Sequence, residues 1–77
     1  MSEHPAVGSA AIEVHLNGTL REVPSGLCVR ELLEHLGLEP GLVVVERNRE
    51  ILSRAAYTGV GVEAGDRLEI VHFVGGG

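Results

Sequence analysis

The chain has 77 residues, enough for one small domain with a single hydrophobic core. A deep catalytic cleft with supporting layers of side chains is hard to build at this size, so the length favours a binding module or carrier over an enzyme. The formal net charge is −5 and lysine is absent, which argues against binding to nucleic acid or an anionic membrane and suits a partner with a basic docking face.

Cysteine usage and hydropathy indicate where the protein works. The single cysteine, Cys28, excludes an intramolecular disulfide and fits a reducing compartment. The first residues contain no basic segment followed by an apolar run, and no apolar stretch is long enough to cross a membrane. We therefore expect a cytoplasmic protein.

The first part of the chain predicts an extension followed by a β-hairpin. Residues 1–10 are small, polar and aperiodic, which is typical of a loose extension. Apolar and polar residues alternate over 11–17, as in a half-buried strand. Asn17-Gly18 tolerates positive φ at both positions and is the strongest short signal for a hairpin. Residues 19–23 return as a second strand, which Pro24 ends.

The period of the apolar residues then changes to that of a helix. Ser25 is a candidate N-cap, and Gly37 is expected to end the helix, with Pro40 marking the break. Positions i, i+3, i+4 and i+7 form one apolar stripe over about two to three turns. These positions are Val29, Leu32, Leu33 and Leu36.

The second half of the chain predicts further strands. A β-branched run over 42–47 indicates a strand buried on at least one side. A tight turn at Asn48-Arg49 leads into a short edge strand over 50–52, and residues 53–64 are expected to form a loop. The Gly65-Asp66 turn then leads into a final apolar strand over 67–73.

The element order β-β-α-β-(β)-β predicts an α+β domain of the β-grasp (ubiquitin-like) type, with a mixed sheet packed on one main helix. The helix provides a crossover connection, so the first and last strands are expected to lie parallel at the centre of the sheet. The predicted organisation is a flexible extension over 1–10, a β-grasp domain over 11–73 and a glycine-rich tail over 74–77.

The glycine-rich tail at the end of the chain suggests a reaction at its terminal carboxylate. Gly75, Gly76 and Gly77 follow directly on a predicted strand and have no side chains to pack. Such a tail can thread a narrow enzyme channel and present the α-carboxylate of Gly77. A free carboxylate is a poor acyl donor, so it requires activation, most simply by a nucleoside triphosphate to an acyl-adenylate. The alternative is a frayed terminus without function.

Taken in order, the motifs over residues 11–77 resemble those of the thiamine-pathway sulfur carriers of the ThiS family. These motifs are Asn17-Gly18, Glu31-Leu32-Leu33-x-x-Leu36, Val43-Val44-Val45-Glu46-x-Asn48 with Ile51 and Arg54, Gly65-Asp66-x-x-Glu69-Ile70-Val71, and Val74-Gly75-Gly76-Gly77. The resemblance implies a carrier that is not itself an enzyme and binds no cofactor.

The same resemblance implies the partners and the reaction. A ThiF-like adenylating enzyme would use MgATP to convert the Gly77 carboxylate into a carboxy-AMP. A persulfide, supplied by a cysteine desulfurase, would then displace AMP and give a C-terminal thiocarboxylate. A ThiG-like thiazole synthase would take that sulfur for the thiazole ring of thiamine.

Alternatives from other classes remain open at this point. The small subunit of molybdopterin synthase (MoaD-like) has the same fold and tail, but it reaches its glycines through a segment containing proline and rich in phenylalanine. Residues 70–74 lack proline and meet three glycines, which favours the thiazole branch. A ubiquitin-like adaptor with an inert tail, or a modifier joined to lysines of other proteins, would share the fold.

A docking surface is predicted beside the tail. If Leu68 and Ile70 face the helix, the outer face of the last strand carries Glu69, Val71 and Phe73. Val44, on the neighbouring strand, then points the same way. The predicted partner-binding set is Val44, Val71, Phe73 and Val74 at the start of the tail, because exposed contiguous apolar area marks an interaction. The alternative is that Phe73 folds onto the sheet edge.

Other reactive side chains form no recognisable site. The four histidines lack metal-ligand spacing, so no metal is predicted. Cys28 is expected to act as a small hydrophobe at the helix start. Arg47, Arg49 and Arg54 are expected to be solvated.

Overall fold

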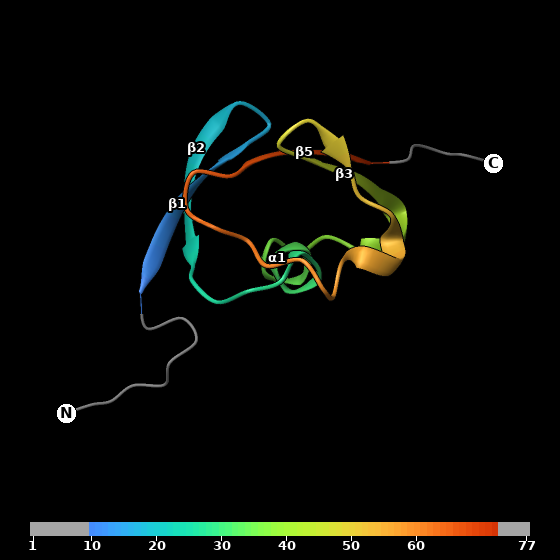
Figure 1. Ribbon diagram of the computed structural model, residues 1–77, viewed down its shortest axis with the longest axis horizontal. Coiled ribbons are helices and arrows are strands. Elements are labelled where there is room, and N and C mark those ends of the chain that lie inside the picture. The colour runs from blue at the N-terminus through green and yellow to red at the C-terminus, as the bar shows by residue number, and fades with distance from the viewer. Residues whose placement is uncertain (1–9, 73–77) are drawn as a thin grey trace.

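A mixed sheet arches over one short helix in the computed structural model, which describes residues 10–72 (Figure 1). The sheet has five strands in the order β2-β1-β5-β3-β4. The strands are β1 (Ala11–Leu16), β2 (Thr19–Pro24), β3 (Val43–Arg47), β4 (Glu50–Ile51) and β5 (Arg67–His72), and the helix is α1 (Val29–His35). This architecture confirms the predicted α+β fold of β-grasp type.

The β1–β2 hairpin follows the prediction closely. The two strands pair antiparallel from Ala11↔Pro24 to Leu16↔Thr19. Asn17 and Gly18 have φ values of 50° and 82°, so both central residues of the turn lie in the left-handed region. Two such residues give the turn a twist that matches the twist of paired strands, which explains the tight connection.

The last strand, β5, lies at the centre of the sheet. It pairs parallel with β1 through His15↔Arg67 and Leu16↔Leu68. On its other side it pairs antiparallel with β3 over five residue pairs, from Val43↔His72 to Arg47↔Leu68. The predicted parallel pairing of the first and last strands is therefore confirmed, with α1 in the crossover between them.

The core lies between the helix and the inner face of the sheet. The strands and the helix contribute nine buried residues to this core: Val14, Leu16, Val23, Val29, Leu32, Leu33, Val43, Val45 and Leu68. The loop before β5 adds two more, Tyr57 and Val62. The Tyr57 hydroxyl donates a hydrogen bond to the Val43 carbonyl at 3.4 Å, which connects this loop to the start of β3. Full burial of each valine or leucine side chain in this core stabilises the fold by about 1.5–3 kcal/mol.

The start of α1 differs from the prediction. Ser25 is not the N-cap, because its N–H donates to the Ala10 carbonyl at 2.9 Å in the turn that leaves β2. Cys28 is the N-cap residue, and its N–H donates to a carboxylate oxygen of Glu31 at 2.9 Å. The next two helical amides donate to carbonyls of the loop before β5, at Val60 and Tyr57. Tertiary partners thus satisfy the helix start in place of a serine side chain.

The end of α1 is as predicted. Gly37 has a φ of 78° and its N–H donates to the Glu34 carbonyl at 3.0 Å, while the Leu38 N–H donates to the Leu33 carbonyl at 2.8 Å. This pair of bonds is a Schellman motif, which satisfies the last helical carbonyls and favours glycine at the left-handed position.

Several element bounds differ slightly from those predicted, since β2 includes Pro24 and β4 ends at Ile51. Leu42 ends a 3₁₀ turn, Pro40–Leu42, instead of starting β3, because the fixed φ of proline suits the first position of a helical turn. The predicted loop over 53–64 contains a second 3₁₀ turn, Arg54–Ala56. Within residues 10–72, no helix has the length and apolar character needed to cross a membrane.

Candidate functional site

Val44 and Val71 lie directly opposite one another on the outer face of the sheet. They are cross-strand partners in the β3–β5 ladder, and Val71 is 60% exposed while Val44 is half-buried. The residues that flank them in sequence, Val43, Val45 and Ile70, face the helix. The structure therefore brings together these two members of the predicted docking set.

The remaining predicted site residues lie outside the described part of the chain. They are Phe73, Val74, Gly75, Gly76 and Gly77. The described part of β5 runs to His72, one residue beyond the exposed Val71. The roles of these five residues stay predictions.

A pair of carboxylates lies next to the two valines. Glu46 and Glu69 are also direct cross-strand partners, and each lies two residues from its valine, Glu46 after Val44 and Glu69 before Val71, so both are on the same outer face. Like charges placed opposite one another destabilise a sheet. The ion pairs within residues 10–72 are Arg30–Glu34 and Arg47–Asp66, and neither involves these two glutamates.

Ile51 completes this surface from β4. It pairs with Glu46, so it lies on the outer face, and it is 72% exposed. We call Val44, Val71, Ile51, Glu46 and Glu69 the outer-face patch. Alternation in the sequence predicts Glu69 on this face, but it reveals neither Ile51 nor the pairing of Glu46 with Glu69, because both depend on cross-strand register. An exposed surface that is both apolar and acidic suits a partner that presents basic side chains among aliphatic ones.

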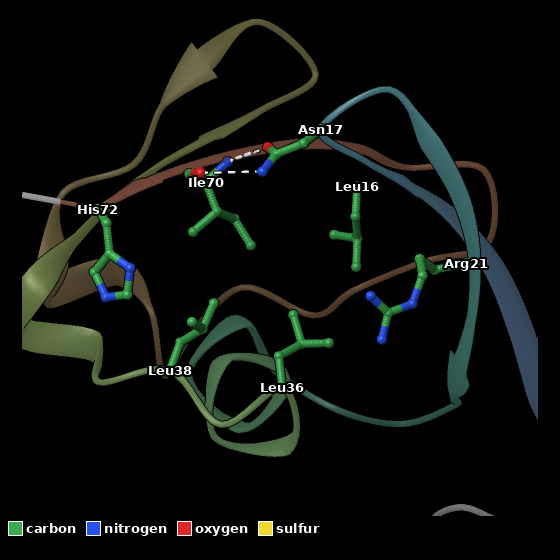
Figure 2. A pocket seen from close by; sticks show the side chains of 7 residues that line it. All are labelled: Leu16, Asn17, Arg21, Leu36, Leu38, Ile70 and His72. Carbon is green, nitrogen blue, oxygen red and sulfur yellow. Dashed lines mark hydrogen bonds between the residues drawn. The ribbon is translucent and has the colours of Figure 1, made fainter.

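Asn17 holds the end of β5 through its side chain, as Figure 2 shows. The Ile70 N–H donates to the Asn17 side-chain oxygen at 2.7 Å, and the Asn17 side-chain amide donates to the Ile70 carbonyl at 3.2 Å. The sequence pattern predicts only a role in the hairpin turn for Asn17. No local signal reveals this second role, since the two residues are 53 positions apart.

A hollow of about 330 Å³ lies below this contact, between the sheet and the end of α1 (Figure 2). Its walls are the apolar side chains of Leu16, Leu36, Leu38 and Ile70, together with Asn17, Arg21 and His72. The His72 side chain therefore points to the helix side of the sheet, away from the outer-face patch.

The start of β5 is fixed by a buried carboxylate. Asp66 is only 6% exposed, and it accepts hydrogen bonds from Arg47 Nε and from the Glu63 N–H, both at 2.9 Å, and from the Asn48 side-chain amide at 3.2 Å. Burial opposes ionisation of Asp66, but these donors outweigh it and hold the pKa of the carboxyl below its ordinary value of 3.8. The prediction that Arg47 is solvated is wrong, because this side chain is half-buried against Asp66.

The described residues offer no obvious catalytic or metal-binding set. Within residues 10–72, no group of three or more histidine, cysteine or acidic side chains is placed to hold a metal ion. Cys28 is half-buried at the start of α1 and forms an isolated bridge with Gly61. The features of interest are therefore a surface, the outer-face patch, and the chain segment that follows β5.

Comparison with known proteins places this domain in a family. The model of the ThiS family matches residues 14–77, from the middle of β1 through the helix and the other four strands to the three glycines. The chain belongs to the ThiS family. This confirms the resemblance seen in the sequence.

Individual relatives are named as a sulfur carrier or as thiazole synthases. The sulfur carrier protein ThiS of Bacillus subtilis is 47% identical over 49 residues, which cover 64% of this chain and 74% of that protein. A thiazole synthase of Magnetococcus marinus is 41% identical over 66 residues, 86% of this chain and 20% of that protein. A thiazole synthase of Paramagnetospirillum magneticum is 45% identical over 62 residues, 80% of this chain and 19% of that protein. This ThiS-family chain thus spans about a fifth of the two thiazole synthases.

Solved structures agree with the fold. The crystal structure of the thiamine biosynthesis protein ThiS from Geobacter metallireducens superposes with a TM-score of 0.74 at 36% identity, covering 86% of this chain and all of that one. A solution structure of a thiamine biosynthesis protein from the same organism gives a TM-score of 0.72, also at 36% identity, covering 86% of this chain and 88% of that one.

Proposed function

We propose that this ThiS-family chain is a sulfur carrier whose Gly77 carboxylate is converted to a thiocarboxylate that donates sulfur for thiazole formation in thiamine biosynthesis. The observation that carries the proposal is the family match, which extends from β1 through Gly77 and so includes both the folded domain and the glycine tail. The relative named as a sulfur carrier, and the two named as thiazole synthases, support the same pathway.

The proposed chemistry takes place at the Gly77 carboxyl carbon. An adenylating enzyme of ThiF type uses MgATP to form the carboxy-AMP and releases pyrophosphate. The terminal sulfur of a persulfide, supplied by a cysteine desulfurase, attacks the carbonyl and AMP leaves. A thiol then cleaves the resulting sulfur–sulfur bond, which releases the thiocarboxylate and leaves a disulfide. The carrier contributes the carboxyl group, and the enzymes contribute the ATP and sulfur chemistry.

We further propose that the outer-face patch is the surface through which these enzymes bind the domain. Exposed Val71 and its partner Val44 offer apolar area, and Glu46 and Glu69 offer two carboxylates that a basic partner would neutralise. Phe73 and Val74 follow Val71 in sequence and would extend this contact toward the glycines. The partners are an adenylating enzyme of ThiF type and a thiazole synthase of ThiG type.

The test is the intact mass of the untagged protein from its own host, grown with and without thiamine. We expect a species that is heavier by the replacement of one oxygen with sulfur and that maps to the Gly77 peptide. Thiamine starvation should enrich this species, whereas enrichment under molybdopterin demand would point to the pterin acceptor. Protein that stays unmodified, even with MgATP, an activating enzyme and a persulfide, would contradict the proposal and favour an adaptor.

A further inference from the structure

The backbone of β5 loses its neighbour on the β1 side before the strand ends. On that side the Asp66 carbonyl accepts from the His15 N–H at 2.8 Å, and the Leu68 carbonyl accepts from the Asn17 N–H at 2.9 Å. The register of β1 with β5 ends at Leu16↔Leu68, because the chain then turns into the β1–β2 hairpin. Backbone groups that face one neighbour recur every second residue, so the next to face β1 belong to Ile70.

The Asn17 side chain supplies the missing partner. A primary amide carries one carbonyl and one N–H₂ group in a plane, as a peptide unit carries one acceptor and one donor. Its oxygen accepts from the Ile70 N–H at 2.7 Å and its nitrogen donates to the Ile70 carbonyl at 3.2 Å. The left-handed conformation of Asn17, with φ of 50°, places this side chain beside β5, and asparagine tolerates that conformation well.

We propose that Asn17 is a positioning residue that holds β5 on its β1 side as far as Ile70, and thereby orients the tail that carries Gly77. This inference rests on the proposed carrier function. Without the amide, β5 is held on the β1 side only as far as Leu68. The segment free on that side then lengthens by two residues, about 7 Å at the rise of an extended strand. The β3 side still holds Val71 opposite Val44, so docking is retained while the tail is positioned less well.

The chain contains a matched control for this residue. Asn48 also has a φ of 50° in a hairpin turn, and its side chain also makes two hydrogen bonds, one to the β5 backbone and one to the carboxylate of Asp66 just before β5. Its oxygen accepts from the Arg67 N–H at 2.9 Å and its nitrogen donates to Asp66 at 3.2 Å. Asn48 therefore holds the start of β5, whereas Asn17 holds its end. Glycine at either position keeps the positive φ and removes only the amide.

Amide hydrogen exchange of Asn17→Gly and Asn48→Gly tests the contact directly. In Asn17→Gly we expect exchange at Ile70 to accelerate by about tenfold or more, as for the loss of one net hydrogen bond, beyond any change at Leu33 in the core. In Asn48→Gly the acceleration should fall on Arg67 and leave Ile70 unchanged. Asn17→Asp keeps an acceptor for the Ile70 N–H and should be intermediate. Equal protection of Ile70 in the wild type and Asn17→Gly would overturn the proposal.

Adenylation kinetics with the cognate activating enzyme test the consequence. For Asn17→Gly we expect kcat to fall by about tenfold with KM for the carrier nearly unchanged, because orientation is lost while docking is kept. Asn48→Gly should match the wild type in both constants. An unchanged kcat in Asn17→Gly would overturn the positioning role even if Ile70 exchanges faster. If the wild type is not adenylated at all, the carrier function fails and this role with it, whereas the exchange data still report on the contact itself.

Discussion

Arg47 Nε lies 2.9 Å from Asp66 Oδ2, and this ion pair joins the end of β3 to the residue that precedes β5. A second guanidinium nitrogen of Arg47 approaches the other carboxylate oxygen at 3.4 Å. The carboxylate also accepts from the Glu63 backbone, so the loop before β5 is tied to the same point. Removing the charge of Asp66 would leave several part-buried donors without a strong acceptor.

The first prediction concerns this carboxylate and pH. The pKa of Asp66 is lower in the folded protein than its ordinary value of 3.8, so the folded state favours the ionised form. Its contribution to stability is complete above pH 3.8 and is lost as the pH falls through the lower folded pKa. Asp66→Asn should reduce the free energy of unfolding by about 1–3 kcal/mol at pH 7. Denaturant titrations at pH 7 and in acid measure this, and a deficit that does not shrink in acid would contradict the assignment.

The second prediction concerns the opposed glutamates of the outer-face patch. Glu69→Gln should raise the free energy of unfolding by about 0.2–1 kcal/mol, because it removes a like-charge pair. The same change should weaken binding to the activating enzyme, mainly by slowing association, and the loss should diminish as salt is added.

Glu22→Gln is its matched control. Glu13 and Glu22 form a second opposed pair, in the β1–β2 ladder. Glu22→Gln should stabilise the domain to a similar extent and leave binding unchanged. If both variants weaken binding equally, the net charge of the chain controls association and the outer-face patch does not.

The third prediction concerns the apolar part of the same patch. Val71→Arg places a cation where a basic partner is expected to dock, so affinity for the activating enzyme should fall at least tenfold, which is about 1.4 kcal/mol. Stability should change by less than about 0.5 kcal/mol, because Val71 is 60% exposed. Leu20→Arg is the control, since Leu20 is 53% exposed on β2, far from β3 in the sheet order. Titration calorimetry that gave the same loss for both would exclude Val71 from the contact.

The fold could be predicted from the sequence because its signals are local. The alternation over β1, the Asn17-Gly18 turn and the stripe of α1 each specify one element, and their order admits few topologies. The prediction of Ser25 as the N-cap was wrong, because the first amides of α1 donate hydrogen bonds to a loop some thirty positions away. Sequence propensity carries no information on such tertiary partners.

The candidate site could be predicted only in part, for the same reason. Alternation alone placed Val44 and Val71 on the outer face. Their direct pairing, the opposed Glu46 and Glu69, and the exposed Ile51 all depend on strand register, which the sequence does not state. The ion pair between Arg47 and Asp66 joins residues 19 positions apart, so the local sequence pattern does not predict it.

The fourth prediction separates stability from function. Leu33 is fully buried under the sheet, so Leu33→Ala should destabilise the domain by about 2–4 kcal/mol through loss of apolar contact and a residual cavity. At a temperature where the variant is still folded, the adenylation rate should match the wild type. Thermal unfolding followed by circular dichroism measures the first effect. A slow rate in the folded variant would indicate that the core contributes to the reaction.

The fifth prediction concerns Gly77. Gly77→Ala should impair adenylation with little change in stability, because a methyl group enters a channel that admits glycine. Residues added after Gly77 should abolish the reaction, since the carboxyl group is then held in a peptide bond. Growth of a host strain without thiamine, complemented by each variant, measures both. Full complementation by the extended chain would contradict a reaction at the Gly77 carboxylate, unless the extension is removed in the cell.

The central position of β5 also has a mechanical consequence. An enzyme that draws the last residues into a channel pulls along β5 while it holds the domain by its surface. Because β5 lies between β1 and β3, hydrogen bonds on both flanks share that force. The strand must slide past its neighbours, so its bonds are loaded together in shear, whereas an edge strand can peel away one bond at a time. The sheet therefore resists the pull along the direction in which the tail is used.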